Sequence, residues 1–383
     1  MRQPNNTLAF RPRLARAEES LRPTRAEIDL DALAHNLGVV RRVAGEARVL
    51  AVVKADAYGH GVAPVAARLE RAGVHGFGVA LAEEGLELRE AGVRSQIVVL
   101  NGVYGNAHAD VLAAELTPVV YDLGQIEAFH RAWGGAPFGV HLKVDTGMAR
   151  LGVPLRGLDE FLEGLGRFRE ARVDGLMTHL ATADSDPEYA VEQLRRFHAA
   201  LGRVRAFGHR PKVVHAANSA ATFAHPGARF DMVRTGVALY GYSTAPGTGG
   251  DLRPVMRLRT EIIALRDLLV GESVGYDSTF TAPRPLRVAT VPVGYGDGLM
   301  RRTSNRGAML VGGRPCPVVG NVSMDLTTLD VSTVPEAALG DEVVVLGGQG
   351  PSRIGAEALA VDAGTIPYEV LTAVSRRVPR FYR

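Results

Sequence analysis

The segment LAVVKADAYGHG, residues 50–61, places a lysine at the end of an apolar run, directly before a glycine-containing turn. Because the run before Lys54 shows no polar alternation, it predicts a buried strand whose C-terminal tip carries an amine. The chain has 44 basic residues, but its only lysines are Lys54, Lys143 and Lys212. Arginine stays charged, whereas a lysine amine can lose its proton and condense with a carbonyl. Lys54 is therefore a candidate for covalent catalysis.

Further polar residues fall at the tips of other predicted strands. They are Lys143, His179, Ser219 and Arg234. Each alone is weak support for a site, since a lone histidine such as His179 is more often a hydrogen-bonded structural residue than a catalyst. Together with Lys54 they place five chemically useful side chains on one predicted rim. This grouping indicates a functional site.

The two segments HAANSAA, residues 215–221, and VRTGVALYG, residues 233–241, carry groups suited to an anion. Ser219 offers a hydroxyl, and Gly236 and Val237 offer backbone N–H groups that can approach a phosphate closely. An amine beside a phosphate site suggests pyridoxal phosphate held by Lys54 as a Schiff base. On these short motifs alone, a rim whose polar groups only bond one another remains the alternative.

The elements that must position these residues alternate between short apolar runs and amphipathic stretches, a rhythm typical of β/α units around a parallel sheet. Helical stretches include 62–72, 81–91, 122–133 and 187–206. Eight strands are predicted to begin near Val49, Gly76, Gln96, Thr117, Gly139, Val173, Val213 and Met232. The fold class is therefore α/β, with an N-terminal (β/α)8 barrel whose chemistry lies at the C-terminal rim of the strands.

After about residue 250 the sequence changes to strand-like segments separated by Gly and Pro turns, with little helical periodicity before Ala356. This texture predicts a second, mostly-β domain, and the Gly-rich segment TGGDLRP at 248–254 is the expected junction. The predicted organisation is a disordered tail over 1–23, a barrel over 24–250 and a β-rich domain over 251–383.

Composition limits the possible partners and compartments. A net charge of +3 gives no case for nucleic acid or an anionic membrane. The N-terminal segment lacks the apolar core of a secretory signal, and no later apolar run is long enough to span a bilayer. Cys316 is the only cysteine, which excludes an intrachain disulfide and fits a reducing cytoplasm. We expect a cytoplasmic protein that acts on a small molecule.

From about residue 24 to the C-terminus, the chain resembles the alanine racemases, a family with a barrel followed by a β domain. The motifs that carry this resemblance keep the family's order. They are AVVKADAYGHG, KVDTGMARLG, THLATAD, HAANSAA, VRTGVALYG, VGYDSTF, VGYGDG, VSMDLTTLD and TIPYEV. The resemblance implies pyridoxal 5'-phosphate as the cofactor, no metal site, and interconversion of L-alanine and D-alanine to supply D-alanine for peptidoglycan.

The resemblance also assigns roles to individual residues. Lys54 would form the internal aldimine, Arg234 would face the pyridine nitrogen, and Arg150 would face the phenolic oxygen and the substrate carboxylate. The phosphate would be bound by Tyr58, Ser219, Gly236, Val237 and Tyr368. Tyr276 would come from the partner subunit of a homodimer, and the backbone of Met324 and the side chain of Tyr295 would complete the substrate site at its entrance.

These roles fit the chemistry of racemisation. A proton must leave one face of the α-carbon and return on the other, so two bases on opposite faces suffice, and Lys54 and Tyr276 can be those bases. Free lysine and tyrosine have pKa values of about 10, so each needs help near neutrality, and His179 can supply it to Tyr276 by a hydrogen bond. Arg234 cannot readily lose its proton and so disfavours protonation of the pyridine nitrogen.

Some alternatives stay open at this point. Lys143 is either carboxylated, as in many family members, or paired with a carboxylate such as Asp145. Barrel proteins that only bind pyridoxal phosphate lack a β domain, and Tyr276 counts against them. Decarboxylases of the same fold class fit the motifs less well. Racemases of serine or of broad specificity are the strongest rivals, because sequence does not determine the size of the pocket.

Overall fold

The computed structural model describes residues 21–383. Residues 1–20, which hold most of the predicted tail, lie outside the described residues. The chain divides into two compact units, which we call the barrel unit and the β-rich unit. The barrel unit is Asp29–Val255, and the β-rich unit is Met256–Arg383 together with the N-terminal segment that ends at Ile28.

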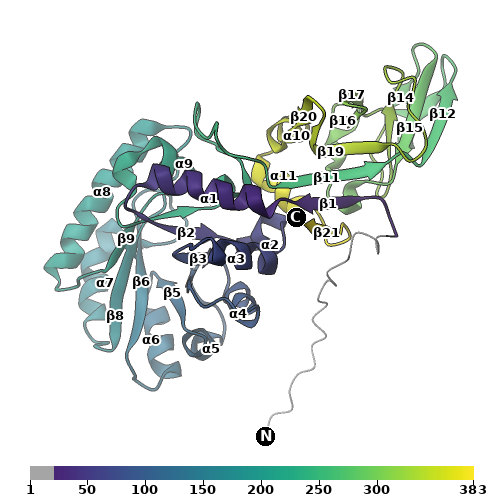
Figure 1. Cartoon of the computed structure of the whole chain (residues 1–383). Helices are drawn as coiled ribbons and strands as arrows, with labels where there is room; N and C mark the ends of the chain where they lie inside the picture. The colour runs from purple at the N-terminus through teal and green to yellow at the C-terminus, as the bar shows by residue number, and fades with distance from the viewer. Residues whose placement is uncertain (1–20) are drawn as a thin grey trace, which may run out of the picture. The chain divides into compact units, whose positions relative to one another are not determined.

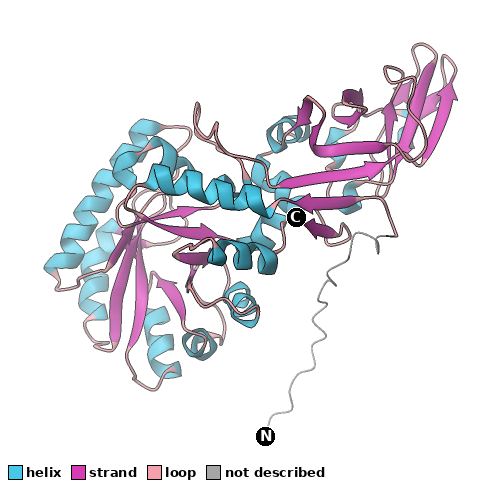
Figure 2. Ribbon diagram, in the orientation of Figure 1, coloured by secondary structure: helices cyan, strands magenta, loops and turns pink. Residues whose placement is uncertain are grey.

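The barrel unit is a nearly closed ring of parallel strands with helices around it (Figure 2). The neighbouring strands are, in spatial order, β10 (Met232–Thr235), β2 (Arg48–Val52), β3 (Gly76–Val79), β4 (Gln96–Val99), β5 (Leu116–Val120), β6 (Phe138–Asp145), β8 (Ala171–Met177) and β9 (Val213–His215). Between β9 and β10, the Arg234 N–H donates to the Ala217 carbonyl at 2.9 Å. The predicted barrel is confirmed, and each strand begins within two residues of its predicted start.

Capped helices connect these strands. Asp29, Asp122 and Asp186 each accept a backbone N–H of the following first turn, as good N-cap residues do. The helices of this unit are α1 (Leu30–Ala44), α2 (Lys54–Gly59), α3 (Val62–Arg71), α4 (Ala82–Glu90), α5 (His108–Ala113), α6 (Leu123–Ala132), α7 (Leu158–Leu165), α8 (Pro187–Ala206) and α9 (Ser219–Ala224). The predicted helical stretches correspond to α3, α4, α6 and α8.

The interior of the barrel is filled by apolar side chains from different strands. One buried cluster contains Leu50, Val98, Val119, Met177, Val213 and Met232. Helices cover the outer face of each barrel strand, and side chains of the other strands cover its inner face. Both faces are therefore buried, which explains why the strand sequences are continuously apolar. This packing fixes the strands, so the residues at their C-terminal ends are held on a rigid support.

The β-rich unit is built on a sheet in the order β17-β16-β19-β11-β1-β21. Its strands are β17 (Arg314–Pro317), β16 (Ala308–Val311), β19 (Glu342–Gln349), β11 (Met256–Glu261), β1 (Arg25–Ile28) and β21 (Arg380–Tyr382), with β20 (Ser352–Ile354) beside β19. A second sheet joins β12 (Ala264–Leu268), β15 (Leu286–Val291) and β18 (Thr327–Asp330). The helices α10 (Ala356–Ala363) and α11 (Pro367–Ala373) complete the unit.

The N-terminal strand differs from its predicted place. β1 pairs antiparallel with β11 and parallel with β21, and Figure 1 shows it in purple between them. Residues 25–28 therefore belong to the β-rich unit and the barrel unit begins at Asp29, whereas the sequence predicted a barrel from residue 24. Strand pairing between segments more than 200 residues apart in sequence leaves no local signal, because RAEI alone does not show its partners.

Within residues 21–383, no helix is both long enough and apolar enough to cross a membrane.

A short left-handed turn follows β2 and carries the first predicted site residues. The four residues Ala55, Asp56, Ala57 and Tyr58 all have φ near +54°. Left-handed backbone costs about 1–2 kcal/mol per residue when a Cβ is present. Such a turn persists only where its surroundings hold it.

Glu84 on α4 supplies part of that support. Its Oε1 accepts the Ala55 N–H at 2.6 Å, and its Oε2 accepts the N–H groups of Ala80 and Leu81 at 2.7 and 3.1 Å. On the other side of the turn, the Asp56 Oδ1 accepts the Val62 N–H at 2.7 Å. One carboxylate therefore joins the tip after β2 to the tip after β3.

We expect Glu84→Ala to destabilise the protein by about 1–3 kcal/mol, because three backbone donors lose an ionised acceptor. Urea unfolding measures this difference. Glu83→Ala is the matched control, since Glu83 is an exposed carboxylate on the same first turn of α4. Equal unfolding free energies for the two variants would show that Glu84 does not support the turn.

Candidate functional site

Lys54 lies directly after β2, at the start of the left-handed turn. Burial lowers the pKa of its amine, the charge of Arg150 lowers it further, and Glu84 acts in the opposite direction. A lowered pKa increases the fraction of neutral amine, which is the form that attacks a carbonyl or takes a proton. The structure therefore gives Lys54 the environment expected of a reactive lysine.

Lys143 lies within β6 and is buried. Burial lowers the pKa of its amine to about 8, and the charges of Arg234 and Arg150 act in the same direction. The carboxylate proposed as its partner, Asp145, acts in the opposite direction on this pKa, and its Oδ1 accepts the N–H groups of Gly147, Met148 and Ala149 at 2.9, 2.9 and 3.2 Å. Asp145 thus shapes the turn that leads to Arg150.

Arg234 is the central group of the rim and is only 3% exposed. Its Nη2 donates to the carbonyls of Thr178 and Ala216 at 2.7 and 2.8 Å. Its Nη1 donates to Nδ1 of His215 at 3.0 Å. Burial lowers the pKa of the guanidinium to about 9, so the group is still charged at neutral pH. These contacts join the C-terminal ends of β8, β9 and β10.

The two histidines beside Arg234 are neutral, because burial and the Arg234 charge hold the pKa of each well below its usual value. The Nδ1 of His179 lies 3.2 Å from Arg234 Nη2, and since a guanidinium can only donate, this nitrogen is the acceptor. The proton of neutral His179 is therefore on Nε2. In the same way His215 carries its proton on Nε2, where it donates to Nδ1 of His141 at 3.0 Å.

Tyr58, Ser219 and Gly236 form a second group on the rim. The Gly236 N–H donates to the Ser219 hydroxyl at 2.9 Å, and Ala238 N–H reaches the same oxygen at 3.4 Å. A Cβ on Gly236 would come within 2.2 Å of the Tyr58 hydroxyl, so only glycine permits this approach. Val237 follows in a buried turn. Hydroxyls and backbone N–H groups that converge in this way fit a phosphate.

The remaining predicted residues belong to the β-rich unit. Tyr276 begins a short turn and is 71% exposed, and the Asn321 side chain donates to its carbonyl at 3.0 Å. Tyr295 and Met324 are also exposed. Tyr368 lies on α11. Large exposed side chains grouped on neighbouring loops mark a binding or assembly surface more often than a random face.

Sequence reasoning missed several residues that shape the site. Glu84 holds the turn after Lys54, and His215 and His141 extend the contacts of Arg234 into the barrel interior. His215 lies at the start of the HAANSAA motif, so its position was visible but its role was not. The link from Glu84 to Ala55 spans 29 residues and has no signature in the sequence.

Family models match both units of the chain. The model described as "Alanine racemase, N-terminal domain" matches residues 28–244, and the model "Alanine racemase, C-terminal domain" matches residues 255–382. A curated alanine racemase of Sorangium cellulosum is 51% identical over 377 residues, covering 95% of this chain and 100% of the relative. One of Symbiobacterium thermophilum is 42% identical over 371 residues, covering 95% and 98%.

Solved structures agree with these matches. Alanine racemase from Bacillus anthracis with bound L-Ala-P has a TM-score of 0.89 and 34% identity, covering 95% of this chain and 96% of that one. Alanine racemase from Bartonella henselae with covalently bound pyridoxal phosphate has a TM-score of 0.87 and 30% identity, covering 94% and 99%. From the barrel, the β-rich unit and these matches, we conclude that the chain belongs to the alanine racemase family, a family of pyridoxal-phosphate-dependent isomerases.

Proposed function

We propose that this alanine racemase exchanges the α-proton of alanine between two bases, Lys54 and Tyr276, in sites shared between the subunits of a homodimer. The observation that carries the proposal is the rim itself. A lysine with a lowered pKa lies beside Arg150, and a converging set of hydroxyl and N–H groups lies on the same rim.

The rim residues fit pyridoxal 5'-phosphate. The Tyr58 hydroxyl, Ser219 hydroxyl and backbone N–H groups of Gly236 and Val237 would hold the phosphate, as would Tyr368 of the β-rich unit. Arg234 would face the ring nitrogen, and Lys54 would bond to the aldehyde carbon. When bound, this cofactor supplies an electron sink for the charge left at the α-carbon when its proton departs.

Lys54 and Tyr276 then move the proton. Burial, with the nearby charge of Arg150, lowers the pKa of Lys54 and so increases the fraction of neutral Nζ that can accept a proton. For Tyr276, support comes from the tautomer of His179, whose proton is on Nε2 because Nδ1 accepts from Arg234. That N–H can donate to a phenolic oxygen and stabilise its deprotonated form. Arg150 would bind the substrate carboxylate, with the backbone of Met324 and the side chain of Tyr295 at the entrance.

Arg234 would favour racemisation over side reactions. Its guanidinium stays charged at neutral pH and is held by carbonyls and neutral imidazoles, so it can donate a hydrogen bond to a ring nitrogen without transferring a proton to it. Arg234 would thereby leave that nitrogen unprotonated and the cofactor a weaker electron sink, so that early return of the proton to the α-carbon would favour racemisation over side reactions.

We also propose that Lys143 is carboxylated by carbon dioxide. Its lowered pKa of about 8 makes the neutral amine available, and the added negative charge would lie among Arg234, Arg150 and Lys54. The alternative partner, Asp145, already accepts three backbone N–H groups. The carbamate would hold Arg150 in place.

Three further features belong to the same proposal. The product D-alanine would supply peptidoglycan synthesis. A reducing cytoplasm would suit the lone buried thiol of Cys316. The exposed side chains of Tyr276, Tyr295 and Met324 would be covered by the barrel rim of a partner subunit, so that the isolated subunit lacks a complete site.

Replacing Lys54 tests the function directly. We expect Lys54→Ala to lose the borohydride-reducible cofactor adduct and the racemisation of alanine, measured by mass spectrometry and chiral chromatography. Lys54→Arg should also lose both, because a guanidinium does not form the carbonyl bond. Lys212→Ala is the matched control, since Lys212 is an exposed lysine paired with Asp174 at 3.0 Å. An adduct on Lys143 or Lys212 instead would overturn the assignment.

Labelled bicarbonate tests the state of Lys143. We expect a carbamate carbon signal in ¹³C NMR that is absent in Lys143→Met and present in Lys212→Met. Only the neutral amine bonds to carbon dioxide, so incorporation should be high above a pH of about 8 and fall as pH drops below that pKa. If wild type shows no carbamate signal at any pH from 6 to about 9, Lys143 is a free amine.

Mixed dimers test the shared site. Lys54→Ala and Tyr276→Phe are each expected to be inactive. After dissociation and reassociation together, a mixed dimer has one site that lacks both bases and one that keeps both, so activity should return to at most half of wild type. If each subunit used its own Tyr276, every site would lack one base. Mixed dimers without activity would therefore exclude sharing.

A further inference from the structure

A buried carboxylate in the β-rich unit has no assigned role in the mechanism. Asp297 is 0% exposed, and the Arg22 Nη2 lies 2.6 Å from its Oδ1. The Arg377 Nε lies 3.3 Å from the same oxygen. The Gly294 N–H donates to Oδ2 at 3.1 Å. A buried charge persists only when it is paired and hydrogen-bonded in this way, so the cluster is a specific construction.

The cluster lies next to two loops that the proposed function places at the substrate entrance. Asp297 is the last residue of η6 (Tyr295–Asp297), and its carbonyl accepts the Ser375 N–H at 3.0 Å. The backbone N–H of Tyr295 donates to the Ser323 carbonyl at 3.0 Å, and that of Gly296 donates to the Met324 carbonyl at 2.9 Å. The Tyr295 and Met324 loops are therefore bonded to each other.

Arg377 links Asp297, in the Tyr295 loop, to the loop that carries Met324. It pairs with Asp297 through Nε and with Asp325 through Nη2, the latter at 2.7 Å. The space between the loops is tight, because a Cβ on Gly294 would lie 2.3 Å from the Ser323 carbonyl oxygen. A Cβ on Gly296 would lie 2.6 Å from Arg377 Nη1. Glycines at these two positions thus allow the loops and Arg377 to pack closely.

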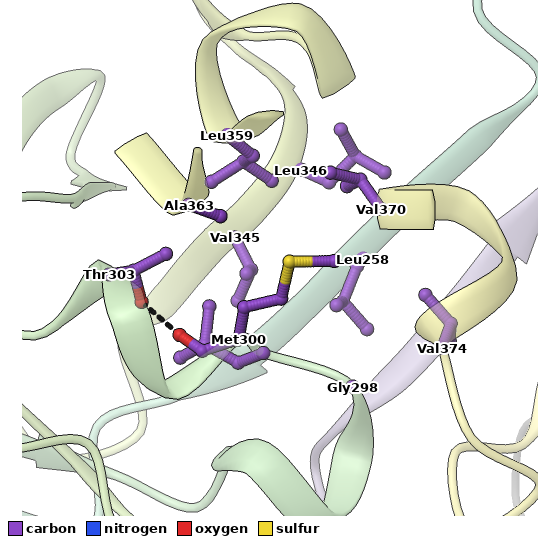
Figure 3. A pocket seen from close by; sticks show the side chains of 11 residues that line it. Leu258, Gly298, Met300, Thr303, Val345, Leu346, Leu359, Ala363, Val370 and Val374 are labelled. Atoms are coloured by element: carbon purple, nitrogen blue, oxygen red, sulfur yellow. Dashed lines mark hydrogen bonds between the residues drawn. The ribbon is translucent and has the colours of Figure 1, made fainter. Parts of the chain in front are cut away.

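The segment that follows Asp297 borders an apolar pocket on another side (Figure 3). Met300 and Val374 point into it, and Thr303 closes a turn by donating to the Met300 carbonyl at 2.8 Å. Apolar contacts are non-directional and leave the orientation of a loop weakly determined. The direction of the 294–300 segment is set by its backbone hydrogen bonds together with the bonds made by the Asp297 carboxylate.

We propose that Asp297, held by Arg22 and Arg377, is a positioning residue for the substrate entrance, and that the segment before β1 therefore contributes to turnover. The inference rests on the proposed roles of Tyr295 and Met324. Arg22 lies three residues before β1 and reaches Asp297 from the other end of the chain, a sequence separation of 275 residues. Loss of the charge at Asp297 frees the Tyr295 loop while leaving the barrel rim unchanged.

The test compares Asp297→Asn, which keeps the shape and removes the charge, with Arg22→Gln. We expect KM for alanine to rise about 3- to 30-fold, with a smaller change in kcat, and a smaller rise of the same kind for Arg22→Gln. Hydrogen exchange should accelerate at residues 294–298 and 323–326. Arg314→Gln is the matched control, because it breaks an exposed ion pair with Glu336 in the same unit.

The outcomes separate this inference from the proposed function. The borohydride-reducible adduct on Lys54 should be present in wild type and in each of these variants. If wild type has no such adduct, that result counts against the proposed function and not against the positioning role. If wild type racemises alanine and Arg22→Gln and Asp297→Asn leave KM and local exchange unchanged, the positioning role is excluded. Should Asp297→Asn not fold, the partly exposed Arg22 still provides the decisive comparison, since its removal leaves Arg377 to pair with Asp297.

Discussion

The guanidinium of Arg234 is a full positive charge placed where water cannot reach it. A buried charge requires partners for its donors, and here they are the carbonyls of Thr178 and Ala216 and the imidazoles of His179 and His215. These acceptors come from the tips after β8 and β9, while Arg234 itself is on β10. The arrangement of three strand ends therefore depends on satisfying one side chain.

Burial and the same charge act together on the protonation of its neighbours. Burial lowers the pKa values of His179, His215 and Lys143, and the Arg234 charge lowers each of them further. The imidazole nitrogen that faces a guanidinium must be the acceptor, so each neutral imidazole carries its proton on the other nitrogen. No carboxylate is needed to set these tautomers. A site with predetermined donors and acceptors costs little reorganisation during proton transfer.

In separate parts of the chain, two carboxylates hold a loop or turn in place by accepting backbone hydrogen bonds. Glu84 holds a strained left-handed turn after β2 in the barrel unit, and Asp297 holds a loop of the β-rich unit. Both accept backbone N–H groups from loop segments next to proposed site residues. Short polar crosslinks of this kind place loops accurately, which apolar packing alone does not do.

The sequence by itself determined the barrel, its strand starts and the identity of the residues on its rim. Those features are local: apolar runs near Val49 and Val213 mark strands, and the order of β/α units brings their C-terminal ends to one side. The motif around Lys54 also singled out this residue as the candidate reactive amine, because lysine is rare in this chain. A family resemblance then assigned roles that spacing alone left open.

Only the tertiary structure decided how those residues are supported. The pairing of β1 with β11 and β21, the contact of Glu84 with Ala55 and that of Arg22 with Asp297 all join segments far apart in sequence. The tautomers of His179 and His215 likewise follow from the position of Arg234. Hydrogen bonds and ion pairs depend on distances of about 3 Å between specific atoms, and residue types along a chain do not encode such distances until the chain has folded.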